Sequence, residues 1–203
     1  MKKYTLDEVY TADMTAFQRE RYNRVADEFE KLFGEKPTAF FSAPGRTEVG
    51  GNHTDHNFGC VLAAGVSLDV IAAVAPDTEE NVITIKSEGF PMDTVNVDDD
   101  TIYEEQKNTS AALIRGMSAG FKKNGHNSGG FKAYATSNVL KGSGLSSSAA
   151  YEVLIGTILN GLYNEGRGFC CGNSSDSSVC GERLFRQAFR TYGPNGFISR
   201  RIY

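Results

Sequence analysis

The sequence lacks an excess of positive charge and any long uninterrupted apolar run. Its 203 residues carry a net charge of −4, which gives no reason to expect nucleic acid or an anionic membrane as a partner. The longest apolar stretch, CVLAAGVSLDVIAAVA, is interrupted by Asp69 and is too short to span a bilayer. The start, MKKYTLDEVYTADM, lacks the apolar core of a secretory signal. We therefore expect no nucleic-acid or membrane partner, and the sequence makes no protein partner evident.

Cysteines are few, and they do not have the spacing of zinc ligands. Three of the four lie near the end of the chain; the set is Cys60, Cys170, Cys171 and Cys180. Free thiols in a reducing cytoplasm fit this pattern better than a disulfide framework. A hydrophobic content of 40% and a charged content of 23% are those of an ordinary globular protein. We expect a cytoplasmic protein.

Apolar periodicity predicts an α+β domain. Helices are expected over residues 14–34, over 108–125 with an Asn or Thr cap, and from Ser146 onward. Strands are expected over 38–43, 60–76 (one strand or a pair), 81–89, 93–99 and 129–139. We expect the Pro-Gly-Arg that follows residue 43 to end the first strand. Strands and helices in this order predict an α+β fold.

The stretch KGSGLSSSAAYEVL, residues 141–154, places two glycines and three serines at the start of a predicted helix. Gly142 and Gly144 let the backbone approach a ligand closely. The first amides of the helix and the serine hydroxyls would then form a cradle for an anion, typically phosphate. The spacing is not that of a Walker A loop, a dinucleotide fingerprint or a nucleophile elbow. A serine-capped helix after a flexible turn is the purely structural alternative.

A second polar stretch, APGRTEVGGNHTDHNFGCVLAAG, covers residues 43–65. Its donors and acceptors suit the hydroxyl groups of a sugar, and Arg46 suits a phosphoryl group on which charge develops. Two alternatives remain open: a metal site made by His53 and His56 around Asp55, and a solvated polar turn. This stretch alone does not decide the function.

Together, the two stretches resemble the galactokinases of the GHMP group of small-molecule kinases. APGR…HTD.N.G.VL resembles the galactokinase signature, and GSGLSSSAA.EV resembles the ATP loop of the group. The resemblance runs from about residue 15 to 167. It implies a GHMP kinase N-terminal domain with the ribosomal protein S5 domain 2-like fold. It also implies transfer of the γ-phosphate of ATP to the anomeric hydroxyl of galactose, with ATP and Mg²⁺ required.

The resemblance also implies roles for individual residues. Arg46 matches the arginine that stabilises the transition state. The sugar-binding run is matched by Asn52, His53, Thr54 and Asp55. The phosphate-binding loop is matched by Gly142, Ser143, Gly144, Leu145, Ser146, Ser147 and Ser148, and Ser148 stands where the family has a magnesium ligand.

The chain departs from the family pattern in its sugar-binding run. Asn52 replaces the glutamate that contacts the sugar, and His56 replaces a tyrosine. An amide can still hydrogen-bond a hydroxyl group but carries no charge. Galactose is the expected substrate, and a GHMP kinase for another sugar such as N-acetylgalactosamine is an alternative. A non-catalytic sensor of sugar and ATP is a second alternative, although the undamaged ATP loop speaks against it.

The composition changes after Arg167. The remaining residues contain no lysine, although ten precede them, and five of the eleven arginines. We expect residues 1–167 to form the GHMP N-terminal domain and residues 168–203 to be an aberrant, disordered tail in place of the rest of the kinase. The structural alternative is an ordinary flexible terminal tail.

The genetic code suggests how such a tail could arise. With suitable synonymous codons, the DNA for residues 182–197, read one base later, encodes Asn-Val-Tyr-Phe-Gly-Lys-Pro-Ser-Gly-Leu-Met-Asp-Gln-Met-Ala. This resembles the next motif of the family, which carries its catalytic aspartate at the position of Gly193; an acidic magnesium ligand would fall near Gly181. We therefore expect a one-base shift near codon 167, and little or no turnover by the chain as it stands.

Overall fold

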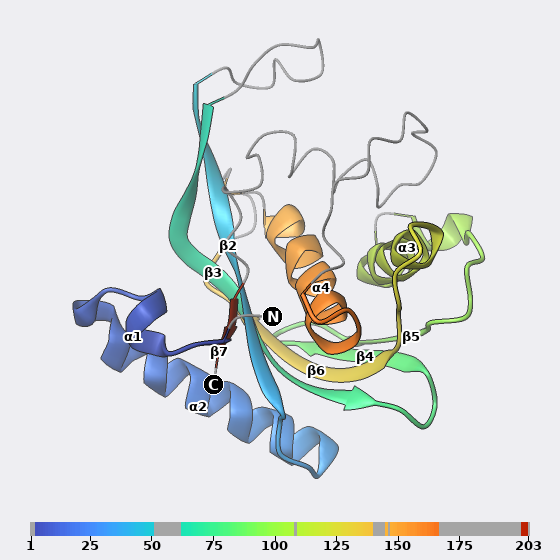
Figure 1. Cartoon of the computed structure of the whole chain (residues 1–203), viewed down its shortest axis with the longest axis horizontal. Helices are drawn as coiled ribbons and strands as arrows, with labels where there is room; N and C mark the ends of the chain where they lie inside the picture. The colour runs from blue at the N-terminus through green and yellow to red at the C-terminus, as the bar shows by residue number, and fades with distance from the viewer. Residues whose placement is uncertain are drawn as a thin grey trace.

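The structure is a computed structural model, and it describes residues 3–50, 62–107, 109–139, 145, 147–166 and 200–202. Its main elements form one seven-stranded sheet with helices on both faces (Figure 1). The strands are β1 (Lys3–Tyr4), β2 (Ala39–Gly50), β3 (Leu62–Asp77), β4 (Val82–Ser87), β5 (Met92–Asn96), β6 (Gly130–Ser137) and β7 (Arg200–Ile202). The helices are α1 (Leu6–Val9), α2 (Ala12–Phe33), α3 (Ser110–Lys123) and α4 (Ser147–Tyr163), with a 3₁₀ turn over Glu104–Gln106.

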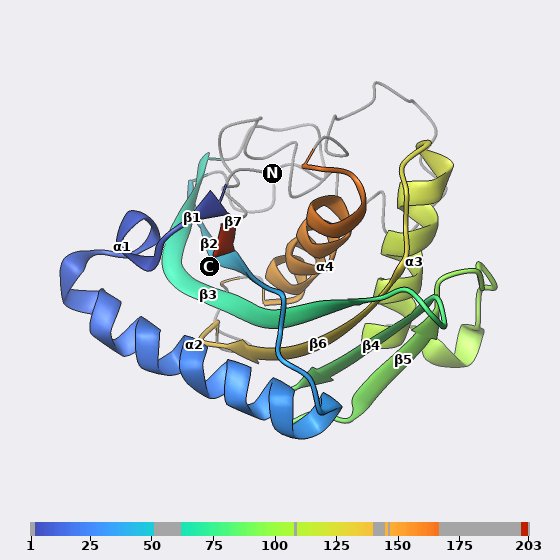
Figure 2. The ribbon, with the colours of Figure 1, turned by 60° about the horizontal axis from the view of Figure 1, so that its bottom comes forward.

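The sheet is mixed, and its order is β1-β7-β2-β3-β6-β4-β5. The pairs β1–β7 and β4–β6 are parallel, and the other pairs are antiparallel. Helix α2 covers one face, while α4 and α3 lie on the other (Figure 2). This arrangement confirms the α+β class predicted from the sequence.

Strand β3 shows why a nearly continuous apolar run forms a strand here. Alternate residues enter opposite cores: Val70, Ala72 and Val74 belong to the core beneath α3 and α4. Ile71, Ala73 and Ala75 belong to the core beneath α2. A strand with both faces covered by helices needs apolar side chains at every position.

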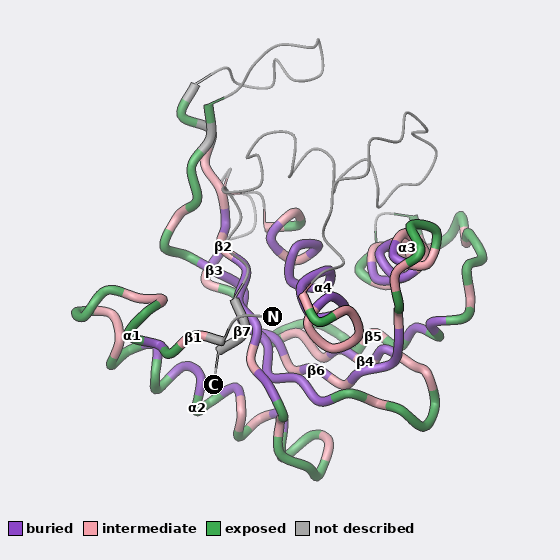
Figure 3. The backbone as a smooth tube through the Cα atoms, viewed as in Figure 1, coloured by how far each residue is buried: buried purple, intermediate pink, exposed green. Residues whose placement is uncertain are grey.

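The three long helices form close to the positions predicted. Helix α2 ends at Gly34, which takes the left-handed conformation with φ 72°. Thr109 caps α3, because its hydroxyl oxygen accepts the N–H of Ala112 at 3.2 Å. Helix α4 begins at Ser147, one residue after the expected start. All residues from 152 to 160 are buried (Figure 3), as expected for a helix packed on every side.

The prediction for the first long strand was wrong about its end. Pro44-Gly45-Arg46 does not terminate β2, which continues to Gly50 beside β3. The register shifts between Pro44 and Arg46, because Pro44 pairs with Asp69 and Arg46 pairs with Gly65. Two steps along β2 therefore match four along β3, and such a bulge accommodates a proline within a sheet. The stretch 60–76 contributes one strand, not a pair.

Candidate functional site

Arg46 lies just beyond the bulge and pairs with Gly65 of β3. In this region β2 and β3 extend together past the rest of the sheet (Figure 1). Its backbone N–H donates a hydrogen bond of 3.1 Å to the carbonyl of Leu145. Leu145 belongs to the predicted phosphate loop, and its side chain packs against the core beneath α4. This bond brings the two sequence motifs into direct contact, although they lie far apart in the chain.

Gly45 allows the same region to pack closely. A β-carbon at this position would lie 3.1 Å from both γ-methyl groups of Val139 and 3.2 Å from one of Val66. Val139 is itself buried and lies three residues before Gly142, the first residue of the predicted loop. A side chain at Gly45 would therefore push the end of the β6 segment away from β2.

The start of α4 provides the other half of the candidate site. Ser147 is half-buried and Ser148 is exposed in its first turn. The first amides of a helix lack intrahelical acceptors, and the helix dipole adds positive potential there. Together with the serine hydroxyls, these amides suit the phosphate groups of a nucleotide.

Glu152 is a buried acid one helical turn after Ser148. Its side chain is 2% exposed, and its Oε2 atom has no hydrogen-bond partner among the described residues. Burial raises the pKa of this carboxyl from 4.5 to about 7, because water no longer stabilises its charged form. Residues four apart share one face of a helix, so Ser148 and Glu152 face the same direction around α4.

The described part of the site offers oxygen ligands, which suit Mg²⁺. The Ser148 hydroxyl oxygen and the Oε2 atom of Glu152, which has no hydrogen-bond partner among the described residues, are the kind of ligand that this cation prefers. When bound to a nucleotide, Mg²⁺ neutralises charge on the phosphate groups. Within the described ranges, no group of three or more histidine, cysteine, aspartate or glutamate side chains is placed to hold a metal.

Many of the predicted site residues lie outside the described part of the chain. These are Asn52, His53, Thr54, Asp55, Gly142, Ser143, Gly144 and Ser146. The alternative metal site of His53, Asp55 and His56 lies there as well. The described site residues are therefore Arg46, Leu145, Ser147 and Ser148.

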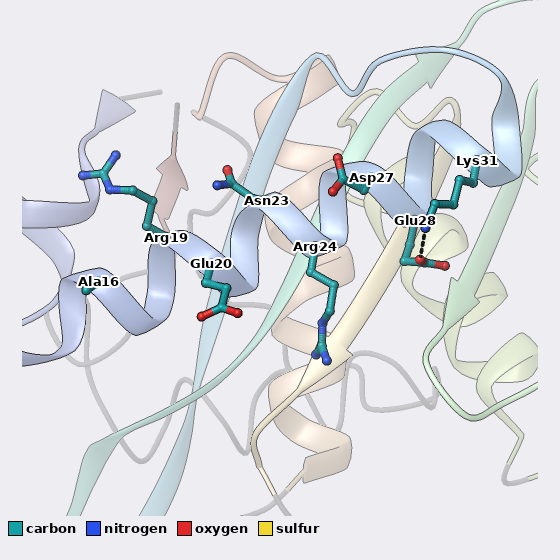
Figure 4. A pocket seen from close by; sticks show the side chains of 8 residues that line it. All are labelled: Ala16, Arg19, Glu20, Asn23, Arg24, Asp27, Glu28 and Lys31. Carbon is teal, nitrogen blue, oxygen red and sulfur yellow. Dashed lines mark hydrogen bonds and ion pairs between the residues drawn. The ribbon is translucent and has the colours of Figure 1, made fainter.

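A surface hollow lies on the outer side of α2, away from this site (Figure 4). It is lined by Ala16, Arg19, Glu20, Asn23, Arg24, Asp27, Glu28 and Lys31. Within it, Lys31 and Glu28 form an ion pair of 2.7 Å on the helix surface. Mixed charges at helical spacing are typical of a solvated helix face, so this hollow is no candidate for the functional site.

Sequence reasoning did not predict a buried polar cluster beneath α2. Asp69 accepts hydrogen bonds from Arg21 at 2.5 Å, from Tyr10 at 2.5 Å and from Ser42 at 2.6 Å. Burial and the charge of Asp69 raise the pKa of the Tyr10 hydroxyl above its ordinary value. The only signal in the sequence was Asp69 itself, a charge within the longest apolar run.

No helix among the described residues is long and apolar enough to cross a membrane. The comparisons with known proteins concern the same segments that form the site. The family model "Galactokinase galactose-binding signature" matches residues 27–76. The model "GHMP kinases N terminal domain" matches residues 111–169.

Curated relatives and a solved structure agree with these matches. The galactokinase of Lacticaseibacillus casei (strain BL23) is 35% identical over 140 residues, which are 68% of this chain and 36% of the relative. The galactokinase of Clostridium beijerinckii is 33% identical over 146 residues, 71% of this chain and 38% of that relative.

The crystal structure of Lactococcus lactis galactokinase complexed with galactose superposes with a TM-score of 0.65 at 27% identity. The superposition covers 71% of this chain and 38% of the other. The chain therefore spans little more than a third of the length of the curated relatives that it matches. The family matches, the shared fold and the contact between the two motifs all lead to the same conclusion. The chain belongs to the galactokinases of the GHMP kinase group.

Proposed function

We propose that the whole protein transfers the γ-phosphate of ATP to the anomeric hydroxyl of galactose. The observation that carries this proposal is the hydrogen bond between the Arg46 N–H and the Leu145 carbonyl. It joins the segment that resembles a sugar-binding signature to the segment that resembles an ATP loop. A kinase needs this proximity, because the sugar oxygen must reach the γ-phosphorus.

Each predicted residue has a distinct task in this reaction. The loop from Gly142 to Ser148 would hold the ATP phosphates, with the Ser148 hydroxyl toward Mg²⁺. The sugar hydroxyls would be bound by Asn52, His53, Thr54 and Asp55. The anomeric oxygen would then form a bond to the γ-phosphorus while the bond to the bridging oxygen of ADP breaks. The Arg46 guanidinium would stabilise the charge on the phosphoryl group in transfer.

The proton of the sugar hydroxyl needs an acceptor, and we propose that residues 168–203 fail to supply it. The family places an aspartate in the motif that a one-base shift restores at Gly193. Loss of such a base costs about 10² to 10⁴ in rate. The match to the GHMP family model ends at residue 169, close to the proposed shift, which supports this division of the chain.

Two measurements test the proposal. The first is the DNA sequence of the gene from codon 167 onward, which must permit the reading that restores the family motif. The second is ADP release by the 203-residue chain and by a frame-restored chain, with galactose, N-acetylgalactosamine and other sugars. We expect turnover of galactose by the restored chain only.

A substitution at Arg46 sharpens the kinetic test. In the restored chain, Arg46→Met should lower kcat by about 10³-fold with little change in the affinity for galactose. A restored chain that binds neither ATP nor any monosaccharide in calorimetry would refute the proposed function. Ordinary rates of galactose phosphorylation by the 203-residue chain would refute the missing base.

A further inference from the structure

The buried cluster around Asp69 lies on the face of the sheet opposite to α4. We call Asp69, Arg21, Tyr10 and Ser42 the Asp69 cluster. The Asp69 and Arg21 residues are 3% and 4% exposed, and their side chains form an ion pair of 2.5 Å. The four members come from β3, α2, β2 and the residue after α1, so the cluster connects the sheet to both N-terminal helices.

The cluster also bonds the backbone of two strands. The second terminal nitrogen of Arg21 donates to the carbonyl of Asp69 at 3.0 Å and to that of Thr136 at 3.3 Å. On the other side, the N–H of Asn138 donates to the same Asp69 carbonyl at 3.0 Å. Asp69 therefore forms hydrogen bonds through both its side chain and its backbone carbonyl. The bond from Asn138 to this carbonyl fixes the segment that follows β6.

At Asp69 the pairing of β3 with β2 is interrupted, and its pairing with β6 has just ended. On β2, its partner is Pro44, and the bulge that precedes Arg46 begins at the next step. On β6, the adjacent pair Val70–Ser137 is the last of the ladder. On β2, Arg46 comes directly after the bulge. After β6, Asn138 and Val139 lead to the predicted phosphate loop.

The energetics of a buried ion pair favour a geometric role for the cluster. Removing two charges from water costs several kcal/mol, and apolar residues of similar volume commonly stabilise a core as well or better. Directed bonds of a charged pair do, however, select one arrangement of the strands over others. The cluster lies where a change of register would move both motifs.

We propose that Asp69 and Arg21 are positioning residues, which fix the bulge of β2 and the end of β6 so that Arg46 meets Leu145. This inference rests on the proposed function for its biological meaning. The structural part, however, concerns two backbone hydrogen bonds that the 203-residue chain contains without any ligand. It can therefore be tested separately from binding and turnover.

Hydrogen exchange of individual amides, followed by NMR in the full 203-residue chain, tests the structural part. In Asp69→Asn, the amides of Arg46 and Asn138 should exchange at least about tenfold faster, while protected amides of β4 change less than about twofold. Equal acceleration of all these amides would show a general loss of stability and would overturn the proposal. Unchanged protection at Arg46 would overturn it as well.

Two milder variants keep the test decisive if Asp69→Asn does not fold. Ser42→Ala removes one donor to Asp69 and leaves both charges in place, so we expect about threefold faster exchange at Arg46. Tyr22→Phe is the matched control, because its hydroxyl lies 3.0 Å from the Tyr10 hydroxyl and does not bond Asp69. Equal effects of Ser42→Ala and Tyr22→Phe at Arg46 would contradict the proposal.

Calorimetry with an ATP analogue and Mg²⁺ connects the structural part to function. If the wild-type chain binds the analogue, Asp69→Asn should weaken binding about tenfold, whereas Val25→Ala, a packing change beneath α2, should leave it unaltered. If Asp69→Asn and Val25→Ala weaken binding equally, the positioning role is wrong. If the wild-type chain binds nothing, the proposed function is weakened for this chain, while the exchange data still decide the structural part.

Discussion

The two faces of the sheet are covered in different ways. Beneath α3 and α4 lies the larger apolar core. The inner parts of these helices are buried (Figure 3). Beneath α2 lies a smaller apolar cluster, centred on Val25 and Phe29, beside the charged Asp69 cluster. The candidate site opens at the end of the α4 layer, whereas the ion pair lies in the α2 layer. Apolar packing thus stabilises the face beneath α3 and α4. On the face beneath α2, hydrogen bonds and an ion pair fix the position of the strands around Asp69.

This difference assigns separate tasks to the two layers. Apolar packing is non-directional, and it supplies most of the free energy of folding. Hydrogen bonds and ion pairs supply less net free energy but specify geometry. A layer that fixes the bulge of β2 and the end of β6 therefore benefits from charged groups, while a layer that stabilises the fold benefits from apolar ones.

The largest expected effect comes from breaking the ion pair. Arg21→Met leaves the Asp69 carboxyl buried without its cation, and unfolding free energy should fall by about 3–5 kcal/mol in urea denaturation. Arg24→Met is the control on the same helix, because Arg24 is exposed and lies 3.4 Å from Glu88. That change should cost less than about 1 kcal/mol. Similar losses for both variants would remove the distinction between the two faces.

The next effect tests the apolar layer. Ile158 is fully buried in α4, and Ile158→Ala should lower the unfolding free energy by about 2–4 kcal/mol because it leaves a cavity. Leu32→Ala in α2 serves as the comparison, since that side chain is 40% exposed and should cost less than about 1 kcal/mol. Hydrogen exchange at Arg46 should follow global stability in Ile158→Ala, without the selective loss expected for Asp69→Asn.

Glu152 is a buried ionisable residue within the layer of α3 and α4, and its effect on stability depends on pH. Its pKa is raised to about 7 in the folded state, so the folded chain retains a proton that the unfolded chain releases near pH 4.5. Below about pH 4.5 the carboxyl is protonated in both states, so its ionisation does not change the free energy of unfolding. As the pH rises from about 4.5 to about 7, the free energy of unfolding falls, and above about pH 7 the loss stays at its full value.

Glu152→Gln should accordingly stabilise the chain at pH 8 by up to about 3 kcal/mol and have little effect near pH 4. Thermal unfolding at a series of pH values measures the difference between variant and wild type. Glu20→Gln, on the solvent side of α2, is the control and should show no such trend. If the stability difference between Glu152→Gln and wild type does not change with pH, the raised pKa of the buried Glu152 carboxyl is contradicted.

The smallest effect is a gain in stability. Gly120 lies inside α3, and a β-carbon there would meet no atom within 4 Å. Gly120→Ala should add about 0.5–1 kcal/mol, because alanine favours the helix more than glycine does. Gly125→Ala is the opposite control: it also has open space, but its φ of 75° strains any residue with a β-carbon. Denaturant midpoints of the two variants should therefore move in opposite directions.

Periodicity in the sequence was sufficient to predict the long helices. The site at the start of α4 was inferred from the glycine-serine motif and the family resemblance, and it stays a prediction. The apolar spacing of α2, α3 and α4 is governed by local geometry, so their limits fell within two residues of the prediction. Two-residue strands such as β1, and the single turn α1, are too short for any period to be recognised. The structure places β7 between β1 and β2, and no local pattern in Arg200–Ile202 predicts this.

The features that sequence reasoning missed depend on contacts between distant residues. The continuation of β2 through Pro44 depends on its pairing with β3, which offers extra residues at the bulge. Arg21 and Asp69 meet only when α2 packs on the sheet, and neither carries a motif. The division at residue 167 and the disorder of the tail stay predictions, and the gene sequence is their test.

The hydrogen bond between Arg46 and Leu145 joins two main-chain atoms. Exchanging the arginine for any residue other than proline therefore preserves the donor of that bond. Position 46 can therefore carry other side chains while the main-chain donor of this bond is retained. A series of side chains at this position, compared for both turnover and stability, would separate the proposed role of the positive charge from that of the main-chain bond.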